Sequence, residues 1–238
     1  MKHQLAIAAM GCLGLMTVID TQAQTNTATE DAPHLLDPPS CPSGRTPQDA
    51  RKFRHGGISY TALLCLNEPN SENRVPNTLS VLTYRSDRQL AAEITVPLDI
   101  EGQVRSVKFD ETTYVLSSNT LTLPVLVDAR LRGFAFDQYT TDLLLFTLKE
   151  RQLRQVLSQN VRRSSWASSP QCEASCLDTT ITKTTVIILP AKPTNGMQDL
   201  QLHTRGKTVP EGVNDKLAQT INHRTNHAFN GQVYEAVP

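Results

Sequence analysis

The sequence lacks the glycine-rich motifs that bind nucleotides. Neither a Walker-type loop nor a dinucleotide-binding glycine pattern occurs in its 238 residues. The Gly-x-Ser-x-Gly elbow, which presents the nucleophile of many esterases, is also missing. We therefore expect no cofactor.

The chain also lacks an excess of charge of either sign. It has 23 Lys and Arg and 23 Asp and Glu, so its formal net charge is zero. A basic stripe or basic tail is not visible in the sequence. This balance argues against nucleic acid and against an anionic membrane surface as partners.

Long apolar runs are missing except at the N-terminus. Leu5–Ile19 is apolar apart from small residues and Thr17, follows the positive Lys2, and precedes small residues that end at Ala23. This arrangement predicts a Sec-type signal peptide over residues 1–23 and therefore a periplasmic or secreted protein. The run is shorter than the roughly 20 residues of a membrane span. No later segment approaches that length, so we expect no stable membrane insertion.

The five cysteines suit an exported chain. Cleavage after residue 23 would remove Cys12 and leave four, which predicts a disulfide framework with three alternative pairings. We favour Cys41–Cys65 and Cys172–Cys176. A lipoprotein signal ending at Cys12 is the alternative, but its apolar region would have only about seven residues. A redox or metal role for the Cys-x3-Cys pair is disfavoured because no histidine lies near it.

The remaining chain is a series of short β-type segments. Residues 24–40 are rich in Thr, Asp and Pro and predict a flexible linker before a single β-rich domain over 41–238. Strands are expected at Ile58–Leu66, Leu79–Tyr84, Ala91–Leu98, Val104–Phe109, Thr113–Leu116, Leu121–Val127, Thr141–Leu148, Thr179–Leu189 and Asp199–His203. Such spacing predicts an all-β, mainly antiparallel sandwich or barrel with at most one or two short helices.

Residues 121–161 contain three further local features. Pro124 removes a ladder donor, so it marks an edge, a bulge or a strand start. The link 128–140 predicts an exposed loop or wide hairpin. Residues 150–161 fit both helical spacing and the return strand of a hairpin, and the neighbouring β signals favour the hairpin.

Several short motifs resemble a loose group of exported, β-rich, hypothetical proteins of Gram-negative bacteria. The motifs are Phe109-Asp110…Tyr114, Thr141-Asp142-Leu143, Arg151 to Leu157, Asn195 to Leu200 and Phe229-Asn230-Gly231…Tyr234. The resemblance covers most of 55–238 and implies a periplasmic or secreted location. It implies no activity and no catalytic residue. Asn230-Gly231 also predicts a hairpin turn, and the aromatic pairs Phe109/Tyr114 and Phe229/Tyr234 are each expected to clamp a hairpin onto the sheet.

Residues with catalytic or metal-binding chemistry are few. His223 and His227 could share a helix face and bind zinc, but Arg224 stands where a metalloprotease needs Glu. His55-Gly56-Gly57 is similar to an esterase oxyanion loop, although a turn explains it better. Carboxylates that could converge for sugar hydrolysis, without any selecting pattern, are Glu93, Asp99, Glu101, Asp110 and Asp142. We expect no metal and assign no catalytic residue.

Trp166 is the only tryptophan and lies in a serine-rich segment. It and the nearby arginines could bind a partner, although a core-capping Trp and an ordinary solvated face are the alternatives. The candidate partner-binding residues are Trp166, Arg151, Arg154, Arg162 and Arg163.

Two function classes remain open from the sequence. The first is a noncatalytic exported β-domain that binds an envelope or secreted protein. The second is a cell-envelope hydrolase whose site is assembled from scattered residues, and only the compartment motivates it. A fold class does not decide between them, and we favour the first.

Overall fold

Every regular element in the described part of the chain is a β-strand. The computed structural model describes residues 40–67, 77–168, 177–210 and 218–238, which lie within one compact unit, Asp37–Pro238. Within these residues no helix is long and apolar enough to cross a bilayer. The predicted all-β, antiparallel fold is therefore confirmed, and its sheets remain open rather than closing into a barrel.

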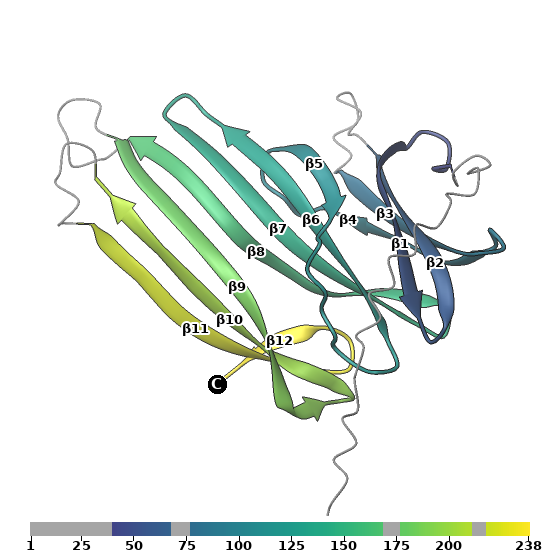
Figure 1. The fold of residues 1–238 in the computed structure, drawn as a ribbon. Helices are drawn as coiled ribbons and strands as arrows, with labels where there is room; N and C mark the ends of the chain where they lie inside the picture. The colour runs from purple at the N-terminus through teal and green to yellow at the C-terminus, as the bar shows by residue number, and fades with distance from the viewer. Residues whose placement is uncertain (1–39, 68–76, 169–176, 211–217) are drawn as a thin grey trace, which may run out of the picture. The chain divides into compact units, whose positions relative to one another are not determined.

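In the described residues, twelve strands form two sheets. Within each sheet, every strand pairs with the strands next to it in the sequence (Figure 1). The small sheet contains β1 (Thr46–His55), β2 (Ile58–Asn67), β3 (Thr78–Arg85) and β4 (Leu90–Pro97). The large sheet contains β5 (Gln103–Phe109), β6 (Leu121–Arg132), β7 (Phe136–Lys149), β8 (Gln152–Ser168), β9 (Leu177–Thr194), β10 (Met197–Val209), β11 (Gln219–Phe229) and β12 (Tyr234–Val237). Short hairpin connections explain this order, because antiparallel neighbours need only a few linking residues.

The turn between β7 and β8 decides the helix-or-hairpin alternative for residues 150–161. Glu150 and Arg151 both have positive φ, 48° and 69°, as a two-residue hairpin turn of the primed type requires. The chain therefore reverses at once, and β8 returns along β7. The favoured hairpin is confirmed. Gly56 and Gly57 likewise have positive φ and form the turn between β1 and β2.

Two strand expectations were wrong, at residues 113–116 and at Pro190, while the hairpin alternative for 128–140 is confirmed and the disfavoured helical histidine pair is excluded. Residues 113–116 are not a strand, because the chain after Phe109 leaves the sheet and crosses to β6. The link 128–140 is not a wide loop, since β6 and β7 pair as far as Arg132 and Asp137. The strand expected to stop at Pro190 continues to Thr194, with a register shift that accommodates the proline. His223 and His227 lie on strand β11, so their separation of about 13 Å excludes the helical zinc pair.

The first core lies between the two sheets. Leu64 and Val81 of the small sheet are fully buried in one cluster with Val125 and Phe146 of the large sheet. Side chains alternate between the two faces of a strand, so one half of each apolar segment enters this core. The alternate apolar side chains of the same strands face away from the small sheet.

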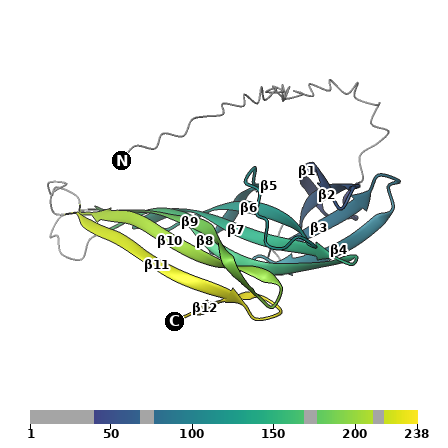
Figure 2. The ribbon, with the colours of Figure 1, turned by 60° about the horizontal axis from the view of Figure 1, so that its bottom comes forward.

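The second core covers that opposite face. Leu143 and Leu145 of β7 and Leu157 of β8 are buried together with Leu200 of β10 and Phe229 of β11. Figure 2 shows β11 and β12 on the side of β6–β8 that is opposite to β1 and β2. Phe229 pairs with Tyr234, and their ring centroids are 5.5 Å apart, so the aromatic clamp predicted there is confirmed. The expected Phe109/Tyr114 clamp was wrong, because Phe109 is buried in the first core whereas Tyr114 packs against the second.

Pro124 of β6 lies just beyond the last residue that pairs with β5, where its lack of a backbone N–H costs no ladder hydrogen bond to that strand. Asp110 donates its N–H to the Pro124 carbonyl at 3.0 Å, and proline cannot return the bond. Arg51 of β1 donates instead to the Asp110 carbonyl at 2.6 Å. Asp49, on the same strand, accepts a hydrogen bond from the Phe109 N–H at 2.8 Å. Two backbone groups at the end of β5 thus have hydrogen-bond partners in β1 of the small sheet, and these bonds join the two sheets.

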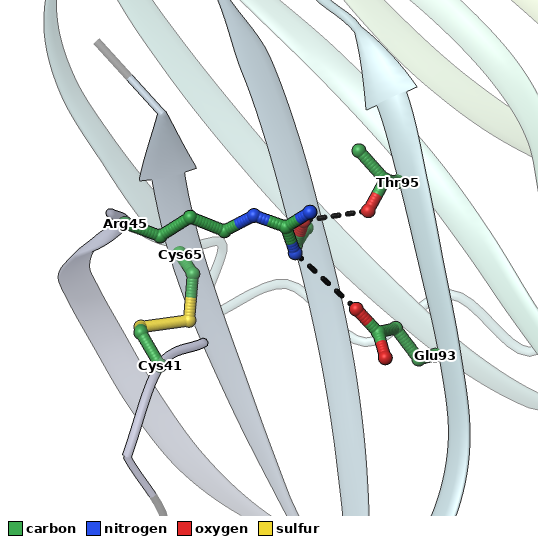
Figure 3. A network of polar contacts seen from close by, with 6 residues as sticks. Cys41, Arg45, Cys65, Glu93 and Thr95 are labelled. Atoms are coloured by element: carbon green, nitrogen blue, oxygen red, sulfur yellow. Dashed lines mark hydrogen bonds and ion pairs between the residues drawn. A yellow bond between two sulfur atoms is a disulfide. The ribbon is translucent and has the colours of Figure 1, made fainter. Parts of the chain in front are cut away.

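Cys41 and Cys65 form a disulfide, as expected (Figure 3). The bond ties the residues before β1 to the C-terminal part of β2, where Cys65 is fully buried. Beside it, Arg45 pairs with Glu93 of β4 at 3.2 Å (Figure 3). A disulfide is compatible with an exported protein. The expected Cys172–Cys176 bond, the signal peptide and nearly all of the linker lie outside the described residues.

Replacement of both Cys41 and Cys65 by alanine should lower the free energy of unfolding by about 3 kcal/mol. The bond closes a loop with a sequence separation of 24, and opening such a loop returns that much conformational entropy to the unfolded chain. Urea denaturation followed by fluorescence measures the loss. Full reduction of the wild type with dithiothreitol should cost at least as much, and a smaller loss would contradict this account.

The Asp49→Ala variant should lose ~1–3 kcal/mol of stability, because it leaves the Phe109 N–H without its partner at the sheet junction. Gln48→Ala is the matched control, since Gln48 is half-buried like Asp49 and its side chain only reaches the Thr46 carbonyl at 3.5 Å. Urea denaturation of both variants provides the comparison. Equal losses in the two variants would show that the Asp49 bond does not hold the sheets together.

Candidate functional site

Cross-strand register places three rows of side chains on one face of the large sheet. Residues that are directly paired in neighbouring strands point to the same face, and residues two apart along a strand share it. We call this set the basic face. Its first row is Asp128, Thr141, Arg162, Lys183, Arg205 and Asn222; its second is Arg130, Tyr139, Ser164, Ile181, Lys207 and Thr220; its third is Arg132, Asp137, Trp166, Thr179 and Val209.

Charge is segregated between the two faces of these strands. The basic face carries six cations, Arg130, Arg132, Arg162, Lys183, Arg205 and Lys207, against the two carboxylates Asp128 and Asp137. The opposite face has Arg163 as the single charged residue in the two rows Ala129, Thr140, Arg163, Thr182, Gly206, Ile221 and Leu131, Gln138, Ser165, Thr180, Thr208, Gln219. A chain with zero net charge therefore has a basic surface on one side of its large sheet.

Three cations in the first row stand directly opposite one another. Arg162 pairs with Lys183, and Lys183 pairs with Arg205. All three are exposed. Within the described residues, Arg162 and Lys183 have no ion-pair partner, and Arg205 donates its Nε hydrogen to His203 Nε2 at 3.1 Å. Like charges directly opposite in a sheet destabilise it, so this cation row lowers the stability of the isolated protein.

Aromatic side chains lie beside the cation row. Tyr139 is 47% exposed and Trp166 is 37% exposed. The Arg130 guanidinium lies over the Tyr139 ring, 4.8 Å from its centroid, and its Nε donates to Asp137 at 2.9 Å. These contacts hold the pKa of Asp137 below its usual range, chiefly through the Arg130 hydrogen bond. The result is a preorganised aromatic and basic surface.

A groove of about 430 Å³ lies where β9 leaves β8. The two strands pair only from Arg162 and Lys183 to Ser168 and Leu177. The groove is lined by Lys108, Asp110, Thr112, Tyr114, Leu126, Asp128, Thr141, Leu143, Val161, Arg162, Lys183, Thr184, Thr185 and Val186. It therefore adjoins the cation row at Arg162 and Lys183 and opens towards the second core.

The acidic side chains of the groove are held by their neighbours. Asp128 accepts hydrogen bonds from Ser106 and Thr141, each at 2.7 Å, and Lys108 Nζ is 3.9 Å away. Tyr114 donates to Asp110 at 3.3 Å. Burial, with the Asp110 carboxylate, raises the pKa of Tyr114 to about 12. Since these carboxylates already have donors, the cations Arg162 and Lys183 dominate what the groove offers to a ligand.

The structure separates the partner-binding residues expected from the sequence. Trp166 and Arg162 lie together on the basic face, while Arg163 points to the opposite face and donates to Gln138 at 2.6 Å. Arg151, in the turn before β8, and Arg154, near the start of β8, lie about 40 Å and about 30 Å from Arg163 at ~3.3 Å per residue. Arg154 donates there to the Gly231 carbonyl at 2.9 Å.

Sequence reasoning missed most of the basic face. Arg130, Lys183, Arg205 and Lys207 come from three other strands, and the expectation that no basic stripe exists was wrong. The local signals are the alternation of Arg130 with Arg132 and of Arg205 with Lys207, each of which places two cations on one face of a strand. The register that brings them beside Arg162 is not visible in the sequence.

Three of the five carboxylates considered for hydrolysis have individual partners. Glu93 pairs with Arg45, Asp110 accepts from Thr112 and Tyr114, and Asp142 accepts from Asn160 Nδ2 at 2.8 Å. Burial raises the pKa of Asp142. In the described part of the chain, no group of three His, Cys, Asp or Glu side chains is arranged to hold a metal ion.

No protein-family model, curated protein or solved structure matches this chain.

The Lys183→Gln variant should be more stable than the wild type at low ionic strength. It removes the cation between Arg162 and Arg205, and relief of each like-charge contact is worth ~0.2–1 kcal/mol. Urea denaturation in dilute buffer measures the gain, which should shrink at about 1 M salt because screening removes the repulsion.

Arg163→Gln is the control for this measurement. Arg163 pairs with Thr140 and Thr182 rather than with cations, so its replacement should give no gain. A stabilisation by Arg163→Gln as large as that by Lys183→Gln would contradict the register on which the basic face rests.

Proposed function

We propose that this protein is an exported, noncatalytic β-domain that binds an acidic envelope or secreted protein through the basic face. The location rests on the signal-peptide pattern of residues 1–23 and on the similarity to exported Gram-negative β-rich proteins. The Cys41–Cys65 bond is compatible with that location.

The cation row carries the proposal. Arg162, Lys183 and Arg205 repel one another across three neighbouring strands, and the described residues supply no carboxylate to Arg162 or Lys183. An acidic partner would remove this repulsion on binding, so part of the binding free energy comes from strain already present in the free protein. Complementary charge also speeds association and disfavours wrong partners.

The residues around the cation row suit a protein partner. Tryptophan, tyrosine and arginine dominate the binding energy of protein interfaces, and Trp166, Tyr139 and Arg130 lie together here. Trp166 and Tyr139 offer exposed ring surface, while the surrounding charges give a polar rim. The sheet is a rigid support, which lowers the entropy lost on binding.

Affinity capture with the tagged chain 24–238, produced in an oxidising compartment and mixed with envelope extract from its own host, tests this function. We expect an acidic protein in near-equal amount, released by high salt. The double variant Arg162→Glu and Lys183→Glu should weaken binding of that protein roughly tenfold or more, because it reverses two charges of the interface. The same variant should not lose stability, so misfolding cannot explain a lost interaction.

Arg163→Glu is the matched control, since it reverses the charge of the next residue on the same strand but on the opposite face. It should leave binding of the captured protein unchanged, whereas Trp166→Ala should weaken it. A captured protein that binds the Arg162→Glu and Lys183→Glu variant as well as the wild type would contradict the proposed interface.

A further inference from the structure

Strand β9 has an unpaired backbone edge in the part that follows Lys183, where it leaves β8. Its ladder with β10 continues from Thr179 to Thr194, but its ladder with β8 stops at Lys183. From Thr184 onward, the edge of β9 that faces away from β10 therefore has no strand partner among the described residues. Such an edge presents free N–H and C=O groups and is a template for another strand.

That edge forms one wall of the groove. Lys183, Thr184, Thr185 and Val186 are consecutive residues of β9, and all four line it. The free backbone groups consequently border a space that the rest of the chain leaves open. The groove is large enough for a few residues of extended chain, since its volume of about 430 Å³ falls in the range of protein ligand sites.

The floor of the groove is apolar. Tyr114, Leu126, Val161 and Val186 are partly buried side chains packed against the second core, and each of them also lines the groove. The second core is thus incompletely covered at this place. An aliphatic side chain laid on the floor would complete it and lose its own contact with water.

The rim of the groove is cationic. Lys183 and Thr185 point to one face of β9, whereas Thr184 and Val186 point to the other, towards the second core. A strand added to this edge would place alternate side chains next to these two sets. Side chains opposite Thr184 and Val186 would reach the apolar floor, and those opposite Lys183 and Thr185 would lie beside Lys183 and Arg162.

We infer that an extended segment of the partner, with alternating aliphatic and acidic side chains, adds as a strand to the β9 edge from Thr184 to Ile187. This assignment deepens the proposed function and rests on it. Main-chain hydrogen bonds supply affinity in strand addition, and the side-chain positions supply specificity. The carboxylates of the segment complement Arg162 and Lys183, and its aliphatic side chains complete the second core.

The peptide acetyl-Asp-Val-Asp-Val-Asp-amide is the probe, titrated into the isotope-labelled full chain and followed by NMR. We expect amide shifts at Thr184 to Val186 and a measurable dissociation constant. Acetyl-Asp-Ser-Asp-Ser-Asp-amide and acetyl-Ser-Val-Ser-Val-Ser-amide should each bind more weakly. A version of the probe with its central backbone nitrogen methylated keeps every side chain but loses a ladder donor, and it should lose binding.

Protein variants separate the parts of the site. Arg162→Gln and Leu126→Ala should each raise the dissociation constant of the probe, the first by roughly two- to fivefold, as one exposed charge pair implies. Arg163→Gln should leave it unchanged. Equal binding of the methylated and unmethylated probes, or shifts that avoid β9, would overturn strand addition.

The result is separable from the proposed function. If the probe fails to bind while capture of an acidic protein still depends on Arg162 and Lys183, strand addition is wrong and the basic face remains the interface. A second copy of this chain in the groove would instead appear as a dimer in sedimentation that dissociates in the Leu126→Ala variant, and it would overturn the assignment to a partner protein.

Discussion

The register of the antiparallel ladders is the constraint on which the rest of the structure depends. Along β6 to β11, each strand is fixed against its neighbour, and the side-chain period of two then decides which residues share a face. A slip of one residue in β8 would exchange Arg162 and Trp166 for Arg163 and Ala167. The apolar segments of β6 and β7 prevent such slips, because moving them by one residue would expose what the two cores bury.

The departure of β9 from β8 connects the fold with the surface. Where β9 is paired with β8, from Leu177 to Lys183, the strands form one continuous sheet, which displays the basic face. After Lys183, Val186 of β9 and Leu200 of β10 pack over β7 and β8 and form part of the second core. The same departure opens the groove and frees a strand edge next to the cation row. Stability alone would favour a closed ladder and mixed charges here.

The sequence predicted the elements better than their arrangement. Local signals succeeded where chemistry within a few residues decides the outcome, as in the Phe229 and Tyr234 clamp and the strand after Glu150. They failed at residues 113–116, where β propensity was overruled by the crossing of the chain to β6. The basic face could not be predicted, since Lys183 and Arg205 become neighbours of Arg162 only through pairing between strands.

The central claim is that the cation row is an anion-binding device retained at the expense of stability. Its most direct test is the thermal midpoint of the purified wild type titrated with polyaspartate, because a ligand of the native state raises the midpoint. We expect a rise for the wild type and a constant midpoint for the triple variant Arg162→Gln, Lys183→Gln and Arg205→Gln. A constant midpoint for the wild type, or an equal rise in both proteins, would contradict the claim.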